Sequence, residues 1–102
     1  MKGYDIDGVI TAGIKPESEA VIITGRSYEE APETYQMLRG LSIFNAVYFN
    51  PMSFDKKTPH NAGRWKAEMV KQLKIKEFSE DSELQANEIR KRCPDIIIHL
   101  IK

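Results

Sequence analysis

The chain has 102 residues and a mass of 11.7 kDa, enough for one domain spanning residues 1–102, which excludes a two-domain enzyme with a separate substrate-binding lobe. Its composition, 41% hydrophobic and 29% charged, is that of an ordinary globular domain. Fifteen basic residues balance fifteen acidic ones, so no overall field attracts nucleic acid or an anionic membrane. The charge is nevertheless uneven, because residues 51–76 hold seven Lys or Arg against two acids, whereas residues 77–88 hold five acids and no base.

The first part of the chain predicts two strands and a helix. Residues 1–6 have a weak strand pattern, diluted by Lys2 and Gly3, and the Val-Ile-Ile-Thr run at residues 21–24 has a strong one. Ser27 and Glu30 form an S-x-x-E capping box, which predicts the start of a helix. The apolar face expected for this helix consists of Ala31, Tyr35 and Leu38.

The middle of the chain predicts a strand, a helix and a short strand. Residues 46–49 form the first strand, and a helix follows that is entered near Thr58-Pro59 or Asn61. A stretch around Phe78 predicts the next strand. The core-facing side expected for the helix, at i, i+4 and i+8, consists of Trp65, Met69 and Leu73.

The last part of the chain predicts a third helix and a fifth strand. The helix begins near Ser82, stops before Pro94, and carries Leu84, Ile89 and Cys93 inward. Residues 95–101, with three consecutive isoleucines, form the strand. Short strands that alternate with helices imply βαβ units, so we expect an α/β fold with a mostly parallel sheet.

The cysteine, histidine and hydropathy patterns exclude several classes of protein. Cys93 is the only cysteine, which excludes a disulfide framework and a cysteine metal cluster. His60 and His99 lack ligand spacing to each other or to Cys93, so a zinc site is not expected. The chain has neither a secretory leader nor an apolar run of about 18 residues, so we expect a cytoplasmic protein without a membrane partner.

The residues at the strand ends predict a site. Parallel sheets bind ligands outside the carboxyl ends of their strands. In this chain those ends carry acids, a hydroxyl and a glycine turn, which converge on one rim. The residues concerned are Asp5 and Asp7, Thr24-Gly25-Arg26, Asn50-Pro51, and Glu80-Asp81.

Asp5 and Asp7 are the first candidates for chemistry. Side chains at i and i+2 of an extended segment point to the same side, so the two carboxylates can share a cleft. Close carboxylates resist ionising together unless a hard cation such as Mg²⁺ neutralises them. The alternative interpretation is that Asp7-Gly8 is only a turn and Asp5 a solvated acid at a strand end.

Other residues on this rim suit an anionic ligand. The Gly25 turn before a capped helix presents backbone N–H groups to an anionic oxygen, and Thr24 adds a hydroxyl, although an ordinary strand-to-helix turn is the alternative. Lys66, expected in the first turn of its helix, has the reach to contact a phosphate, but most helical lysines face solvent. Glu80 and Asp81 either join the other acids or simply favour the N-terminus of the next helix.

The order of these motifs resembles the haloacid dehalogenase-like (HAD) phosphohydrolase superfamily. The motifs are Asp5-Ile6-Asp7-Gly8-Val9, Ile23-Thr24-Gly25-Arg26, Lys66 and Glu80-Asp81. The resemblance covers nearly the whole chain; its first motif is the most specific and Lys66 the least. It implies a Rossmann-like three-layer sandwich with a five-stranded sheet of order 5-4-1-2-3, and a Mg²⁺-dependent phosphatase that acts on phosphomonoesters through an aspartyl-phosphate intermediate.

The resemblance also implies a role for each motif residue. Asp5 would be the nucleophile, and Asp7 would protonate the leaving oxygen and then activate water. Mg²⁺ would be held by Asp5, the backbone carbonyl of Asp7 and Asp81, with Glu80 supporting it through water. The groups that would bind the phosphoryl oxygens are the Thr24 hydroxyl, the Gly25 amide and Lys66.

The spacing leaves no room for a cap domain over this site. Only 13 residues, 8–20, separate Asp7 from Val21, and residues 50–63 are expected to form only a loop. The chain therefore resembles the capless branch of the superfamily, whose members often act on large substrates because nothing closes over the site. The shortness of the chain is also compatible with an alternative, a catalytically inactive HAD-like binding protein.

A basic stretch after the third strand supplies another functional hypothesis. We expect residues 50–64 to overhang the rim, either contacting a phosphorylated polymer or nucleotide or forming a solvated loop. Together with Thr24-Gly25-Arg26, the helix after it and the helix of Lys66, the stretch is similar to the phosphatase domain of phage polynucleotide kinases, which implies a nucleic-acid or nucleotide end-processing phosphatase. The substrate and the oligomeric state stay open. The candidate substrate contacts are Arg26, Lys56, Lys57, His60 and Arg64.

Overall fold

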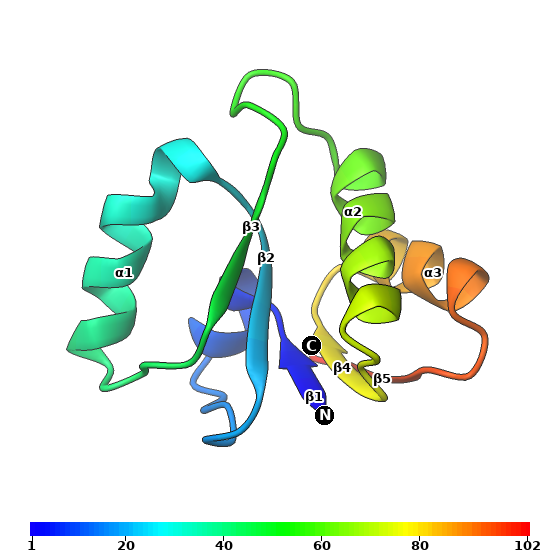
Figure 1. The fold of residues 1–102 in the computed structure, drawn as a ribbon, viewed down its shortest axis with the longest axis horizontal. Helices are drawn as coiled ribbons and strands as arrows, with labels where there is room; N and C mark the ends of the chain where they lie inside the picture. Colours follow the sequence, from blue (N-terminus) through cyan, green and yellow to red (C-terminus); the bar gives the residue numbers. More distant parts are fainter.

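The computed structural model describes residues 1–102 as five strands with helices on both faces of one sheet (Figure 1). The strands are β1 (Lys2–Tyr4), β2 (Val21–Ser27), β3 (Val47–Asn50), β4 (Glu77–Glu80) and β5 (Ile97–Leu100). The helices are α1 (Ala31–Gly40), α2 (Pro59–Gln72) and α3 (Glu83–Arg92). Every predicted element is present, within a few residues of its expected bounds.

The sheet has the order β3-β2-β1-β4-β5, and all of its strand pairs are parallel. This confirms the predicted α/β fold and the predicted order 5-4-1-2-3, which is the same order counted from the other edge. The chain adds strands outward from β1, first on one side and then on the other. Ligand crevices of open parallel sheets form at such a reversal, which here lies at β1.

Two cores lie on opposite faces of the sheet. On the α1 side, eight buried hydrophobic residues, among them Tyr4, Ile22 and Leu38, form one cluster. On the side of α2 and α3, seven others, including Ile23 and Phe78, form the second. Successive residues of β2 serve opposite cores because side chains alternate along a strand. The result is the expected three-layer arrangement, with α1 on one side and α2 and α3 on the other (Figure 1).

Local polar residues start the helices as the sequence predicts. The Ser27 N–H donates to Glu30 Oε2 (2.8 Å), which completes the capping box. A tight turn, Tyr28–Glu30, comes first, and α1 begins only at Ala31. Thr58 Oγ1 accepts from the Asn61 N–H (3.2 Å) at the start of α2. Of the two predicted entry points, Thr58-Pro59 is therefore correct.

The predicted inner face of α2 is confirmed in part, because Trp65, Met69 and Leu73 pack against the core, but other residues of the helix are buried more deeply. Trp65, Met69 and Leu73 are only partly buried at the margin of the core, whereas Lys66 is buried. Small residues explain the difference, because they let α2 approach its neighbours closely. A Cβ on Gly63, for example, would lie 3.0 Å from Glu88 Cβ of α3. The residues that α2 buries are Ala62, Gly63, Lys66, Ala67 and Val70.

Two predicted core positions, one in α1 and one in α3, are wrong. Tyr35 of α1 is exposed, and its neighbour Thr34 is buried instead, where its hydroxyl donates to the Glu30 carbonyl (2.7 Å). Leu84 of α3 is exposed, and Ala86 takes the inward position because α3 packs closely against α2. Leu38 and Ile89 are buried as predicted.

The segment between β1 and β2 contains no cap domain. It winds through the short turn Ile6–Ile10, whose apolar residues enter the core on the α1 side, and then returns to β2. The longest helix, α2, has 14 residues, and none of the helices is long and apolar enough to cross a membrane.

Candidate active site

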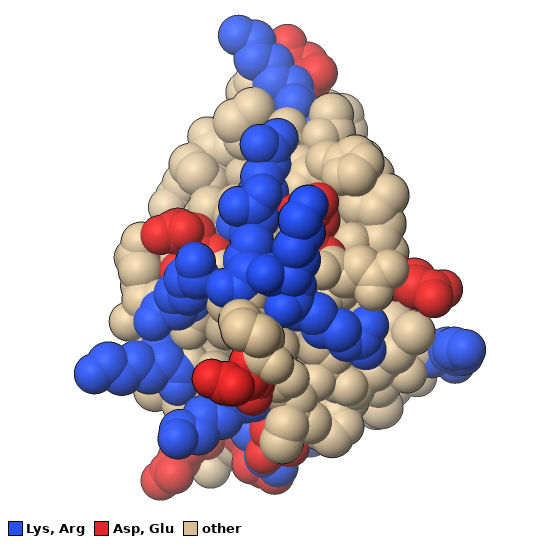
Figure 2. All heavy atoms as spheres, turned by 90° about the vertical axis from the view of Figure 1, so that its right-hand side faces the viewer, with Lys and Arg blue, Asp and Glu red and all other residues tan.

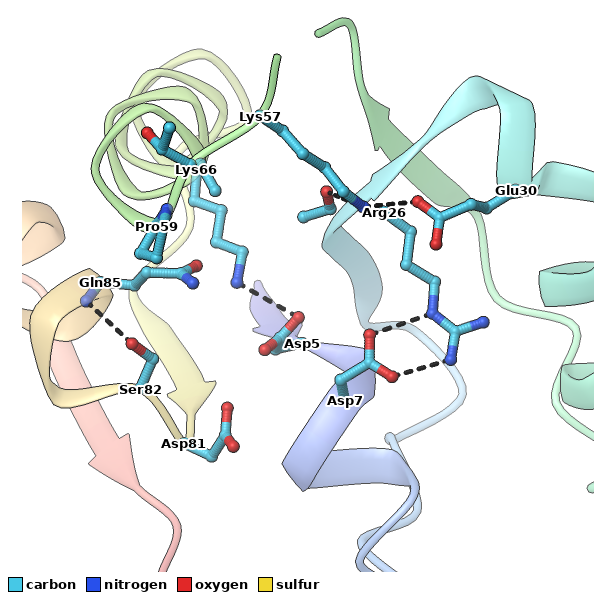
Figure 3. A pocket seen from close by; sticks show the side chains of 13 residues that line it. Asp5, Asp7, Arg26, Glu30, Lys57, Pro59, Lys66, Asp81, Ser82 and Gln85 are labelled. Carbon is cyan, nitrogen blue, oxygen red and sulfur yellow. Dashed lines mark hydrogen bonds and ion pairs between the residues drawn. The ribbon is translucent and has the colours of Figure 1, made fainter. Parts of the chain in front are cut away.

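A pocket of about 420 Å³ lies at the carboxyl ends of β1, β2 and β4, between the first turns of α2 and α3 (Figure 3). Charged and polar side chains dominate its lining. The lining residues that the sequence predicts are Asp5, Asp7, Gly25, Arg26, Lys57, Lys66 and Asp81. Those that it does not predict as site residues are Glu30, Thr58, Pro59, Ala62, Ser82 and Gln85.

At the bottom of the pocket, a buried lysine joins two buried acids. Lys66 is 1% exposed, and its Nζ lies 2.7 Å from Glu80 Oε1 and 3.2 Å from Asp5 Oδ1. The sequence predicts Lys66 in the first turn of its helix, but in the structure it is the eighth residue of α2. Because Lys66 lies two turns into α2, its ammonium group lies below the carboxyl ends of the strands. Asp5 therefore has a cationic neighbour at a fixed position.

Burial and charge shift the pKa values of this buried group. Burial raises the pKa of Glu80 to about 8, with the charge of Asp5 adding to the effect and Lys66 opposing it. Burial alone would lower the pKa of Lys66, but Asp5 and Glu80 raise it above its ordinary value. Lys66 therefore carries its charge at neutral pH, and Glu80 loses its proton at a higher pH than an exposed glutamic acid does.

Asp7 faces the other side of the pocket and pairs with Arg26 (Figure 3). The guanidinium donates two hydrogen bonds to the Asp7 carboxylate, Nε to Oδ2 (3.0 Å) and Nη2 to Oδ1 (2.7 Å). Its third nitrogen donates to Thr34 Oγ1 of α1 (3.1 Å), which fixes the arginine in place. The Arg26 hydrogen bonds hold the pKa of Asp7 below its ordinary value. Asp5 and Asp7 thus share the pocket but have different partners.

Asp5, Glu80 and Asp81 can hold a metal ion. One carboxylate oxygen of each lies within 4.8 Å of the others. Oxygen ligands of this kind suit a hard divalent cation, so the donor set fits Mg²⁺ without identifying it. The Asp7 carboxylate is outside this cluster because it pairs with Arg26.

Gly8 allows the first motif to approach Asp81. Its φ is +80°, a conformation that strongly favours glycine, and a Cβ there would lie 1.9 Å from Asp81 Oδ2 and 2.8 Å from Asp81 Cβ. Any larger residue would have to displace the aspartate. Glycine at this position therefore keeps the acidic cluster together.

Thr24 does not line the pocket, although the sequence predicts it as a phosphate ligand. It is fully buried, and its Oγ1 accepts from the Arg26 N–H (3.1 Å). The predicted glycine turn after residue 24 is wrong, because β2 continues to Ser27 and Gly25 lies in an irregular part of this strand. Gly25 does line the pocket. The first turns of α2 and α3 also reach it, through Thr58 and Ser82, so partial positive charge of two helix N-termini faces the cavity.

Of the basic residues and His60 in the stretch after β3, only Lys57 lines the pocket. Lys57 lines it and pairs with Glu30, whereas Lys56 is exposed and outside the lining. His60 and Arg64 belong to α2 and not to a loop, because α2 begins at Pro59. His60 Nδ1 lies 3.6 Å from Glu88 Oε1, on the side of α3. Of the predicted substrate-contacting residues, only Lys57 and Arg26 of β2 therefore line the pocket.

Glu30 and Gln85 are pocket residues that sequence reasoning missed. Glu30 appears in the sequence only as a capping residue, but the same carboxylate also binds Lys57, and Lys57 and Ser27 hold its pKa below the ordinary value against the effect of burial. Gln85 lines the pocket near Lys66, and its buried Oε1 has no hydrogen-bond partner (Figure 3). No sequence signal marks Gln85, because its role depends on the meeting of α2 and α3.

Comparison with protein-family models, with curated proteins and with solved structures gave no match to this chain. What the structure establishes is a small Rossmann-like α/β domain with a five-stranded parallel sheet. At the carboxyl ends of its strands, it gathers an acidic cluster able to hold a metal ion and, beside it, a buried lysine. The function has to be argued from this geometry.

Proposed function

We propose that the protein is a Mg²⁺-dependent phosphatase of the capless HAD type, which hydrolyses phosphomonoesters through an aspartyl phosphate on Asp5. The observation that carries the proposal is the environment of Asp5. Its carboxylate is at the bottom of an open pocket, 3.2 Å from the ammonium group of Lys66 and within the acidic cluster of Glu80 and Asp81. A nucleophilic carboxylate that must approach an anionic phosphoryl group needs such neutralising neighbours.

In the first step, an Asp5 carboxylate oxygen attacks phosphorus, and the bond between phosphorus and the leaving oxygen breaks. Asp7 gives a proton to that oxygen, so an alcohol leaves. Arg26 holds Asp7 as a carboxylate in the absence of substrate. Proton donation therefore requires that this ion pair opens, which the entry of an anionic phosphoryl group beside Arg26 favours, and that Asp7 then takes up a proton from solvent. Asp7 returns one proton to solvent when it pairs with Arg26 again at the end of the cycle.

In the second step, Asp7 accepts a proton from water, whose oxygen attacks the phosphorus of the aspartyl phosphate. Inorganic phosphate leaves and the Asp5 carboxylate is regenerated, so atoms and charges balance over the cycle. Lys66, Gly25 and the N-terminal turns of α2 and α3 line the pocket that would receive the phosphoryl oxygens. Thr24 contributes by accepting a hydrogen bond from the Arg26 N–H in the irregular part of β2 that contains Gly25.

The metal would be held by Asp5 and Asp81, with Glu80 beside them and the backbone carbonyl of Asp7 as a further ligand. When bound, Mg²⁺ supplies positive charge that offsets the repulsion between the nucleophile and the phosphoryl group. Glu80 also positions Lys66, since its Oε1 accepts from Nζ (2.7 Å).

The experiment that tests the proposal is release of inorganic phosphate from a panel of phosphomonoesters, in Mg²⁺ and in EDTA. Asp5→Asn is nearly isosteric, so it should abolish turnover while the fold survives. Asp95→Asn, an exposed aspartate after α3, is the matched control and should keep full activity. Acid-quenched protein should carry a phosphoryl group in the wild type and none in Asp5→Asn. Turnover that persists in Asp5→Asn, or silence of the wild type across the panel, would contradict the proposal.

A further inference from the structure

The two edges of the sheet differ in how they are protected. β3 and β5 are the edge strands, and each has a neighbouring strand on one side only. Proteins usually protect such edges with charged side chains, proline or a covering element, because an open edge pairs with other chains. β5 has Asp95 shortly before it, and His99 within it pairs with Glu77. β3 has no comparable protection.

The segment that contains β3 is uncharged throughout. Residues 40–54 contain no Asp, Glu, Lys, Arg or His, and they are the longest stretch of this kind in a chain of which 29% is charged. β3 lies within it, at Val47–Asn50. In Figure 1, β3 is at the front of the sheet and no helix passes over it. Pro51 follows the strand, so it removes no backbone donor within β3.

The backbone of β3 presents hydrogen-bonding groups to solvent at two residues. The Ile22 N–H of β2 donates to the Ala46 carbonyl (2.9 Å), which shows that the backbone of Ala46 faces β2. Backbone groups alternate in direction along a strand, so those of Tyr48 also face β2, whereas those of Val47 and Phe49 face away from the sheet. The open edge therefore offers two N–H donors and two carbonyl acceptors.

Apolar side chains flank this edge at both ends. Phe44, in the connection from α1, is 74% exposed, more than any other large hydrophobic side chain of the protein. Met52, shortly after β3, is 36% exposed. Both are four residues from Tyr48, one before it and one after it. An antiparallel pairing of β3 with a copy of itself, centred on Tyr48, therefore brings Phe44 of one copy beside Met52 of the other.

We propose that β3 pairs antiparallel with β3 of a second copy of this chain, so that the two sheets join about a two-fold axis at Tyr48. In this register, Val47 of each copy exchanges two backbone hydrogen bonds with Phe49 of the other. All four outward groups of each edge are then paired. The dimer goes beyond the proposed phosphatase activity and does not depend on it.

The absence of charge favours a second copy over a different protein as the partner. In a two-fold interface the same surface patch faces itself, so a charged side chain near the axis lies close to its own copy. Like charges placed opposite each other across two strands are destabilising. Residues 40–54 bring no such repulsion to a self-pairing edge. A partner of different sequence is usually selected by complementary charge, which this edge does not provide.

Sedimentation of the full chain over a range of concentrations tests the proposal first. The paired surface is small, so we expect the 11.7 kDa monomer in dilute solution and a dimer of twice that mass at about 500 μM. Phe44→Lys should raise the Kd of the dimer at least about ten-fold, because it replaces an apolar contact with an unpaired charge. Phe44 is mostly exposed, so this variant keeps the fold.

Ile97→Lys is the matched control, because Ile97 is a 55% exposed side chain of the other edge strand, β5. It should leave the Kd of the dimer unchanged. A wild type that stays monomeric up to about 500 μM would overturn the proposal. A dimer that Ile97→Lys weakens as much as Phe44→Lys does would also overturn it. Phosphate release by the wild type tests the proposed chemistry separately, since the dimer can fail while turnover persists, and the reverse.

A cross-link tests the register of the two strands. The Cα atoms of an antiparallel pair without mutual hydrogen bonds are about 4.5 Å apart, which a disulfide can span. Cys93 is the only cysteine, so the test uses a Cys93→Ser background. There, Tyr48→Cys should form a disulfide-linked dimer on oxidation, whereas His99→Cys, in β5, should stay monomeric. Equal cross-linking of the two variants contradicts the proposed pairing.

Amide hydrogen exchange tests the same pairing without altering β3. The N–H groups of Val47 and Phe49 should exchange more slowly in the wild type as its concentration rises, and this slowing should be absent in Phe44→Lys. The Tyr48 N–H, which faces β2, should be protected in both proteins. If Val47 and Phe49 exchange at the same rate at every concentration, β3 is not the interface and the proposal is wrong.

Discussion

Basic residues lie in two regions of this protein that resemble each other in composition and differ in structure. At the pocket, Arg26, Lys57 and Lys66 each pair with an acid. On the outer side of α2 and α3, Figure 2 shows Lys and Arg side chains gathered over the surface, and among the exposed residues of these helices Lys71 and Lys91 have no ion-pair partner. A paired cation has a defined position, whereas a solvated one contributes only a screened field.

This difference indicates which basic residues can form an anion-binding site. The pocket cations are held by acids from distant parts of the chain, so an anion entering the pocket meets charge at fixed points. The outer cations include Arg90 and Lys91 in the last turn of α3, where positive charge also favours the helix C-terminus, and Arg92, which pairs with Glu88 one turn earlier on the same helix. Their clustering therefore has an adequate explanation in helix stability, and the predictions below compare the two regions directly.

The largest expected effect is that of removing the buried lysine. Lys66→Met would leave Asp5 and Glu80 buried without their cation, so the free energy of unfolding in EDTA should fall by about 3–5 kcal/mol. Lys71→Met, on the exposed side of the same helix, should change it by less than about 0.5 kcal/mol. Urea unfolding measures both. Similar values for the two variants would contradict the distinction between paired and solvated cations.

A second prediction concerns pH and follows from Glu80. Burial raises the pKa of this carboxyl from 4.5 to about 8, so the folded metal-free protein keeps a proton that the unfolded chain releases. The free energy of unfolding in EDTA should therefore fall as the pH rises between about 4.5 and 8. Mg²⁺ binding should strengthen over the same window, because a carboxylate must lose its proton to act as a ligand.

Unfolding in EDTA at several pH values and Mg²⁺ titration calorimetry measure these opposite trends. Glu80→Gln cannot titrate, so it should flatten both of them. A wild-type protein whose stability and Mg²⁺ affinity do not change between pH 5 and 8 would show that Glu80 is ionised throughout this range.

A third prediction separates backbone strain from contact with the acidic cluster. Gly8→Ala places a Cβ against Asp81 at a φ of +80°, and Gly13→Ala has comparable strain, at +103°, with no atom within 4 Å. Both variants should lose about 1–3 kcal/mol of stability. Only Gly8→Ala should weaken Mg²⁺ binding, by roughly ten-fold or more, because it displaces Asp81. Equal Mg²⁺ affinities in the two variants would remove Asp81 from the metal site.

The sequence predicts features that depend on neighbouring residues and misses those that depend on distant ones. The capping box of Ser27 and Glu30 and the alternation of strands and helices are visible in local patterns, and both are confirmed. The strand order is also confirmed, but its prediction came from the family resemblance and not from a local pattern. The burial of Lys66 is not visible, because helical periodicity alone favours Trp65 and Met69 as the inner face. Its inward position follows from two buried acids that come from β1 and β4, and no local pattern of α2 contains that information.

The smallest expected effect on stability is that of replacing Arg26. This substitution best separates the effect of ion pairing from the effect of burial. The Asp7 side chain is 61% exposed, so Arg26→Met should cost about 1 kcal/mol or less, close to the cost of Arg64→Met on the exposed side of α2. The two variants should differ in the titration of Asp7. Its pKa should rise toward the ordinary value in Arg26→Met and stay low in Arg64→Met, because only Arg26 donates to the carboxylate. An NMR titration of the Asp7 carboxyl carbon in the metal-free protein measures this shift. If Asp7 titrates alike in both variants, the pocket cations differ from the outer ones in burial alone, and the proposed release of Asp7 from Arg26 loses its basis.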